Sequence, residues 1–294
     1  MNYDEIVAQI EVIEAWLVKV GQAPSRSRFA RYKADLSILA DPQKRDNLLG
    51  HFTPEQLHEL FFTFIEISEI HTVLSTLVPQ YEPLIRDRLI EAVTGPASSA
   101  AEKPANAGNR PRNLQFELFL MAQLASSGFP IEETKLGDVQ TAFRGRAIVF
   151  ECKRPQALTG IHAAIKDGIA QLRKALNGES MPFTVLAISL TKAMTEGRSL
   201  LRAPDPRTAM ERLTVSIHEQ MEAHIPYFHR QAGLLVAGIL VHTCVTTLPA
   251  NPPSIAAVGA QVFFDNPQLA QDDQAFIRDW FSEYERIEKL APEL

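Results

Sequence analysis

The segment Ala147-Ile-Val-Phe-Glu-Cys-Lys153 determines how the second half of the chain is interpreted. Its apolar residues run directly into a glutamate and a lysine, which is typical of a buried strand that ends at a polar site. Side chains alternate between the two faces of a strand, so Glu151 and Lys153 share one face, while Phe150 and Cys152 share the other. Burying both charges is costly unless they pair or bind something. The strand end is therefore the first candidate site.

A second strand is predicted just before this one. Residues 138–143 have a strand-like pattern, Arg144-Gly145 is typical of a tight turn, and the chain then returns through 147–153. The two strands form a predicted hairpin. Asp138, at the start of the first strand, can approach Glu151 across the ladder.

Predicted helices on either side of the hairpin add one carboxylate and one amide. These are Glu117 in the helix over 113–126 and Gln171 in the helix over 160–176. Two or three converging carboxylates supply the oxygen ligands that Mg²⁺ requires. A nearby lysine can orient a metal-bound water or offset the charge of a phosphate. The pattern therefore favours metal-dependent attack of water on a phosphodiester.

At these residues the sequence resembles the PD-(D/E)xK nuclease superfamily, which has the restriction-endonuclease-like fold. The resemblance covers about residues 110–190 and rests on Glu117, Asp138, Glu151 with Lys153, and Gln171. It implies that Asp138 and Glu151 bind Mg²⁺ or Mn²⁺, helped by Glu117 and by the main-chain carbonyl of Cys152. It also implies that Lys153 positions the attacking water and that Gln171 belongs to the catalytic group.

Two positions depart from the family pattern. Gly137, rather than proline, precedes Asp138, and Ala175 stands where some subfamilies have a tyrosine. A second ExK triplet, Glu133-Thr-Lys135, follows no apolar strand and has no aspartate at hairpin distance. We therefore place the site at the later triplet.

The charge balance limits how the chain could bind a nucleic acid. The chain has 294 residues and a formal net charge of -6, so any phosphate-binding surface must be local. Arginines gather in sequence around the motif, and they form either a solvated face or a basic rim for phosphates. We expect the rim, formed by Arg112, Arg144, Arg146, Arg154 and Arg173.

Cysteines, histidines and apolar runs indicate an ordinary cytoplasmic protein. Cys152 and Cys244 offer neither a disulfide framework nor a metal-ligand spacing. The histidines between 162 and 242 also show no metal spacing, and His242 is expected in the core. The start of the chain lacks signal-peptide features. The longest apolar stretch, 233–245, is too short to span a membrane, so we expect no membrane partner.

The first 95 residues predict an all-helical unit. Apolar spacing indicates helices over 2–20 and 26–39, and Thr53-Pro54 is a strong helix start. Pro79 is expected to end that helix, with another over about 83–93. Residues 96–111 are small, polar and rich in breakers, which predicts a linker or mobile loop.

Residues 112–294 predict a nuclease-like α/β domain in which helices flank a mixed sheet. The expected helices cover 113–126, 160–176, 207–223 and about 268–289, and the expected strands cover 129–131, 138–143, 147–153, 183–190, 234–246 and 256–264. The leading hypothesis is a metal-dependent nuclease, with DNA ahead of RNA as substrate. The alternatives are an inactive module of the same fold that binds nucleic acid or protein, and an assembly protein that forms oligomers or binds a partner through residues 1–95.

Overall fold

The computed structural model describes residues 3–41, 48–101, 109–133, 136–175, 182–195, 200–201, 203–247 and 256–288. The chain divides into two compact units. The first comprises 1–118, 194–212 and 244–259, and the second comprises 119–193, 213–243 and 260–294. The expected linker, 96–111, falls in the sequence of the first unit, and its residues 102–108 lie outside the described residues. That 112–294 forms a separate domain stays a prediction.

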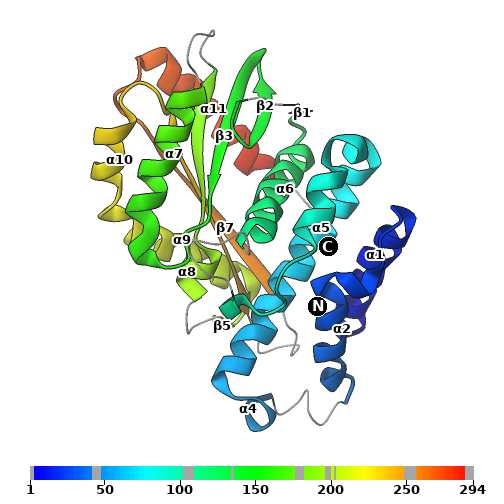
Figure 1. The fold of residues 1–294 in the computed structure, drawn as a ribbon. Helices are drawn as coiled ribbons and strands as arrows, with labels where there is room; N and C mark the ends of the chain where they lie inside the picture. The colour runs from blue at the N-terminus through cyan, green and yellow to red at the C-terminus, as the bar shows by residue number, and fades with distance from the viewer. Residues whose placement is uncertain are drawn as a thin grey trace. The chain divides into compact units, whose positions relative to one another are not determined.

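The N-terminal region is helical, as the sequence predicted. Its main helices are α1 (Tyr3–Lys19), α2 (Arg28–Leu36) and α5 (Pro54–Ala92), which pack against one another (Figure 1). Short turns and one short helix accompany them: η1 (Pro24–Arg26), η2 (Ser37–Ala40), α4 (Leu48–His51) and η3 (Ser99–Ala101). Apolar side chains spaced by three or four residues, such as Ile6, Ile10 and Ile13, are fully buried and form the core. Within the described part of 1–95, Val12 and Val18 are the large apolar side chains left exposed.

The predicted helix break at Pro79 is wrong, because α5 continues through Pro79 and Pro83 to Ala92. A proline inside a helix denies a hydrogen bond to the carbonyl four residues earlier. Here the carbonyls concerned are those of Ser75 and Pro79. Ser75, Pro79 and Pro83 recur every four residues and are all exposed, so these carbonyls lie on the solvent side. The opposite face, including Leu77 and Ile85, is buried and keeps the helix continuous.

The start of α5 was predicted correctly. The Thr53 side chain accepts a hydrogen bond from Gln56 N, and the Gln56 side chain accepts one from Thr53 N. This reciprocal capping satisfies two of the backbone donors that a helix start leaves free. By length and composition α5 is long and apolar enough to cross a membrane, but buried core helices of soluble proteins meet the same criterion. Because 61% of its most apolar window is buried within the protein, α5 is weak evidence for a membrane span.

Seven strands of the described residues form one mixed sheet, in the order β1-β2-β3-β4-β6-β5, with β7 also paired with β6. Strands β1 (Ile131–Glu132), β2 (Val139–Phe143) and β3 (Arg146–Lys153) are antiparallel neighbours. Strand β4 (Phe183–Ser189) runs parallel to β3, and β6 (Gly238–Thr247) runs parallel to β4. The remaining strands are β5 (Leu200–Leu201), parallel to β6, and β7 (Ala256–Asp265). The predicted hairpin is therefore confirmed as β2 and β3.

Helices cover both faces of the sheet in the second unit. Gly168 of α7 (Ile161–Ala175) lies against Lys153 and Leu186, so α7 covers the face that carries Glu151. Trp280 of α11 (Gln271–Glu288) contacts Phe150 at 5.6 Å between ring centroids, so α11 covers the other face. The α/β arrangement of a mixed sheet flanked by helices is thereby confirmed.

Most helices and strands of the second half lie within a few residues of their predicted ranges, as α6 (Arg110–Ser126) and α9 (Pro206–Glu222) show. The predicted end of α7 at Asn177-Gly178 lies outside the described residues. Four short elements were missed: η5 (Leu158–Gly160), α8 (Thr191–Thr195), β5 and α10 (Ile225–Ala232). For α10 the sequence did hold a signal, since Pro226 stands in its first turn and Gly233, with φ +53°, ends it.

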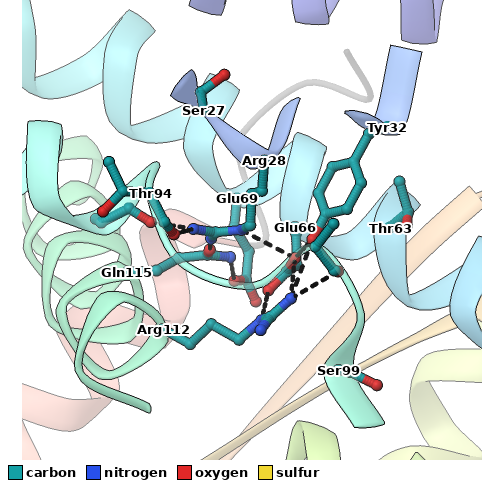
Figure 2. Close-up of polar contacts among 12 residues, drawn as sticks. Ser27, Arg28, Tyr32, Thr63, Glu66, Glu69, Thr94, Ser99, Arg112 and Gln115 are labelled. Atoms are coloured by element: carbon teal, nitrogen blue, oxygen red, sulfur yellow. Dashed lines mark hydrogen bonds and ion pairs between the residues drawn. The ribbon is translucent and has the colours of Figure 1, made fainter. Parts of the chain in front are cut away.

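A buried charge network joins helices of the first unit (Figure 2). The carboxylate of Glu66, on α5, pairs with the guanidinium groups of Arg28 on α2 and Arg112 on α6, and all three side chains are at most 2% exposed. The Tyr32 hydroxyl also donates to Glu66 and accepts a 3.1 Å hydrogen bond from Arg112. Gln115 accepts a hydrogen bond from Arg28. Two cations thus surround one buried anion.

Replacing Glu66 with glutamine is expected to destabilise the first unit strongly. The two guanidinium groups would remain buried without their counter-charge, and breaking such a group typically costs about 3–5 kcal/mol. Glu82→Gln is the matched control, because Glu82 also lies on α5 but pairs with the exposed Lys19 at 3.0 Å. Its loss should change the free energy of unfolding only slightly, because water and salt screen an exposed ion pair. Urea unfolding of both variants measures the difference, and equal losses would contradict a stabilising role for the network.

The same network predicts a loss of stability in acid. Burial alone would raise the pKa of Glu66, but the charges of Arg112 and Arg28 outweigh it and lower the pKa to about 2. A lowered pKa in the folded state stabilises the protein above the unfolded value, and this contribution disappears as the pH falls toward 2. Between about pH 4.5 and pH 2, the free energy of unfolding should fall more steeply for the wild-type protein than for Glu66→Gln. Parallel curves would show that Glu66 does not contribute in this way.

Candidate active site

The site begins where the chain enters β2, because Asp138 is fixed to β3 at two points. Its backbone N–H donates to the Phe150 carbonyl at 2.8 Å, and its side-chain Oδ2 accepts a 2.8 Å hydrogen bond from Cys152 N. In the ladder, Phe150 also pairs with Val139. Two residues of one strand therefore face one residue of the other, as in a β-bulge, a feature that can re-aim a side chain. Asp138 is held beside the end of β3.

Gly137 allows the chain to approach β3 this closely. Its φ is +75°, which favours glycine, and a Cβ at this position would lie 2.7 Å from both the Phe150 carbonyl oxygen and Val149 Cγ1. Proline, which stands here in the nuclease pattern that the sequence resembles, requires φ near −65° and cannot adopt this conformation. Glycine therefore suits the backbone geometry of this chain.

Glu151 and Lys153 pair on the same face of β3. The side chain of Glu151 is 8% exposed and that of Lys153 is 18% exposed, so the pair is largely removed from water. Lys153 Nζ donates to Glu151 Oε1, to the Cys152 carbonyl oxygen at 3.3 Å, and to Gln171 Oε1. Three oxygens therefore surround one ammonium group at the end of the strand.

Gln171 reaches this group from α7, and Gly168 allows the helix to come close enough. Gly168 lies one turn before Gln171 and faces the sheet, where a Cβ would collide with the side chain of Leu186 and lie 3.5 Å from the stem of Lys153. A larger residue would push α7 away from β3. Two glycines position the site, Gly137 and Gly168, and both were missed as functional residues. The sequence did hold a signal, because Gly137 precedes Asp138 and Gly168 lies one helical turn before Gln171.

The two carboxyl groups influence each other directly. Burial raises the pKa of Glu151, and the nearby charge of Asp138 and a side-chain hydrogen bond with it raise the pKa further. Lys153 acts in the opposite direction without cancelling the effect. Ionisation of Glu151 is therefore disfavoured by its burial and by the carboxyl group of Asp138 beside it.

This donor set fits a hard divalent cation. The carboxylates of Asp138 and Glu151 are close enough to share a hydrogen bond, and a carbonyl oxygen of Cys152 lies near Lys153 Nζ. Oxygen ligands of this kind suit Mg²⁺ or Mn²⁺, which fill their other positions with water. Within the described residues, no group of three or more His, Cys, Asp or Glu side chains could hold a metal ion. The protein would therefore supply only two carboxylates.

Glu117 is not part of the cluster described above. It belongs to the first unit, where its carboxylate pairs with Arg88 of α5. The side chain of Glu117 is 13% exposed and that of Arg88 is 30% exposed. The second unit therefore brings together four of the five expected catalytic residues: Asp138, Glu151, Lys153 and Gln171.

The expected basic rim is wrong at Arg112. Its side chain is 2% exposed and is bound to Glu66 in the network of the first unit, so it cannot meet a phosphate on the surface. The pattern of arginines in sequence could not reveal this, because the partner carboxylate lies 46 residues earlier in the chain.

Two further arginines lie at the opposite end of the hairpin from Asp138. Arg144 pairs with Asp279 at 2.6 Å, and Arg146 pairs with Asp273 at 3.0 Å, both on α11. Five strand residues, or about 17 Å of β2, separate this end from the carboxylates. Arg144 and Arg146 therefore do not form a rim around the site.

Two arginines of the expected rim remain near the cluster in sequence. Arg154 follows Lys153 directly and is half-buried, while Arg173 is exposed on α7, two residues after Gln171. Arg173 Nη2 donates a 3.3 Å hydrogen bond to the Gln231 carbonyl. These two residues keep their expected role as a prediction.

Gly137→Ala is expected to disturb both stability and the position of Asp138. Alanine would carry the strain of a positive φ, about 1–2 kcal/mol, and would also collide with β3. Gly145→Ala is the matched control, because Gly145 has φ +76° but nothing within 4 Å of an added Cβ. Thermal unfolding should show a larger loss for Gly137→Ala than for Gly145→Ala. Equal losses would mean that close approach to β3 is not what requires glycine.

Comparison with protein-family models, with curated proteins and with solved structures found no match. The geometry of this site and its sequence motif are therefore what indicate a function. The geometry brings together two adjoining carboxyl groups and one lysine at the open end of the β2–β3 hairpin, with one glutamine from α7.

Proposed function

We propose that this protein is a metal-dependent nuclease that hydrolyses phosphodiester bonds, with DNA ahead of RNA as substrate. The observation that carries the proposal is the pair of adjoining carboxyl groups, Asp138 and Glu151, beside the ammonium group of Lys153. Such a pair is unfavourable as a structural element, because burial and the neighbouring Asp138 both oppose ionisation of Glu151 and raise its pKa. A divalent cation would remove that penalty, which gives the arrangement a functional reason.

Asp138, Glu151 and the Cys152 carbonyl would hold the cation, and it would supply Lewis-acid activation of water and of the phosphate. Other groups of the site orient the carboxylate and the ammonium. Cys152 N–H orients the Asp138 carboxylate, and Gln171 holds the Lys153 ammonium on the sheet face that carries Glu151. An ammonium group fixed there offsets negative charge on a phosphate that approaches the carboxylates.

We name a nucleic acid because the motif resembles those of nucleases and because basic residues lie in the cluster or near it in sequence. Lys153 is in the cluster itself, Arg154 follows it, and Arg173 is exposed on the neighbouring helix. The overall charge of -6 requires positive charge of this local kind. The restriction-endonuclease-like identity of the fold belongs to the same proposal.

A second candidate is an inactive module with the same fold that binds nucleic acid or a protein partner. One observation favours it: Lys153 already donates to Glu151, to the Cys152 carbonyl and to Gln171, so an internal cation occupies much of the oxygen set. In addition, Glu117 is held by Arg88, leaving two carboxylates in the cluster. In this reading the lysine is a permanent counter-charge.

A nuclease assay with added Mg²⁺ or Mn²⁺ distinguishes the two candidates. The wild-type protein should cut DNA with metal and not with a chelator. Asp138→Asn, Glu151→Gln and Lys153→Met should each lower the rate by about 10²-fold or more, since each removes charge from the reacting centre. Double-stranded, single-stranded and RNA substrates should be compared in the same assay.

The matched control is Asp279→Asn, which neutralises an exposed carboxylate paired with Arg144 at the other end of the hairpin. Its activity should equal that of the wild type. Calorimetric titration with Mn²⁺ provides a second readout, because binding should weaken in Asp138→Asn and Glu151→Gln. If the wild type and the three site variants are equally inactive while nucleic acid still binds, the inactive module is the correct candidate.

A further inference from the structure

Two histidines of the second unit come together away from the carboxylate cluster. His162 lies in the first turn of α7, and His224 is the residue that precedes α10. Helices α7 and α10 lie side by side (Figure 1), and the ring centroids of the two histidines are 4.5 Å apart with their planes at 89°. The sequence showed no metal spacing here, because 62 residues separate the two positions.

The His224 ring has a polar atom that protein packing leaves unsatisfied. Its Nδ1 is buried and has no hydrogen-bond partner among the described residues. Removing a ring nitrogen from water without giving it a partner is unfavourable. A bound ion would supply the missing partner. His162 is exposed, so this side of the pair is open to an ion from solvent.

The separation of the rings matches that of two ligands at a right angle. A metal–nitrogen bond of about 2.0–2.1 Å puts a metal about 3.2 Å from the centroid of an imidazole ring. Two such rings at 90° around one metal have centroids about 4.5 Å apart, whereas a tetrahedral angle gives about 5.2 Å. The observed 4.5 Å is therefore the separation that right-angled coordination requires, provided that one nitrogen of each ring faces the same point.

We propose that His162 and His224 form a binding site for a divalent transition metal of tetragonal preference, Ni²⁺ or Cu²⁺. Imidazole nitrogens suit both ions, and right-angled geometry is typical of them rather than of tetrahedral Zn²⁺. Water would fill the remaining coordination positions of the metal, because no third His, Cys, Asp or Glu of the described residues joins the pair. This site is independent of the proposed nuclease centre, which uses oxygen ligands.

A metal at this point would fasten α10 to α7. The two helices already meet through a tilted ring contact between Tyr227 and His162, at 4.5 Å between centroids, and through the hydrogen bond from Arg173 to the Gln231 carbonyl. Helix α7 also carries Gln171, which holds Lys153. Binding would therefore stiffen the helix that supplies one residue of the carboxylate cluster.

Calorimetric titration with Ni²⁺ and electron paramagnetic resonance with Cu²⁺ test the site in the full chain. The wild type should bind one equivalent of Ni²⁺ that His162→Asn and His224→Asn each weaken at least tenfold. The Cu²⁺ spectrum should show coupling to two nitrogens, reduced to one in each variant. Asparagine is favoured before a helix, so His224→Asn should preserve α10. Unfolding temperatures in metal-free buffer confirm that the variants are folded.

Two controls separate this site from others. His218→Asn removes an exposed histidine that contacts Phe264 instead, and it should leave binding unchanged. The double variant Asp138→Asn/Glu151→Gln should also keep the Ni²⁺ equivalent, whatever happens to nuclease activity. Unchanged Ni²⁺ affinity in the two histidine variants would overturn the proposal. So would dependence on only one of the two histidines, since a single surface histidine would then be the ligand.

Discussion

A buried carboxylate needs a positive partner, and this protein meets that requirement in two opposite ways. In the first unit, Glu66 is held between two guanidinium groups, and its pKa falls to about 2. In the second unit, Glu151 has one ammonium partner and a second carboxyl group beside it, and its pKa rises. The first arrangement has more than enough positive charge and is complete in itself. In the second, burial and a neighbouring carboxyl group oppose the ionisation of Glu151, so we assign a structural role to the first arrangement and propose a functional role for the second.

Local patterns predicted much of the fold. The apolar run into Glu151 indicated β3, Arg144-Gly145 indicated the turn, and Thr53 indicated the start of α5, all because these signals act over a few residues. The break expected at Pro79 failed for a non-local reason. Burial of one side of α5 in the first unit keeps the helix continuous, while the carbonyls freed by the prolines lie on its exposed side.

The same distinction applies to the candidate site. The proximity of Asp138, Glu151 and Lys153 could be predicted because strand alternation and hairpin pairing follow from sequence, whereas Gln171 was expected from the resemblance to the nuclease pattern. Arg112 could not, since its surface or interior location depends on Glu66, which is distant in sequence. The importance of Gly137 was equally hidden: a glycine before an aspartate is ordinary until its φ and its distance to the Phe150 carbonyl are known.

Lys153 is the residue on which the two functional readings diverge. Its ammonium group sits among oxygens of Glu151, Cys152 and Gln171, which is where positive charge is most favourable in the absence of metal. A lysine bound this firmly lowers the gain from adding a cation, but it does not remove the repulsion between Asp138 and Glu151. Because Lys153 carries a single positive charge beside two carboxyl groups, our proposal is that a divalent ion would balance the second carboxylate.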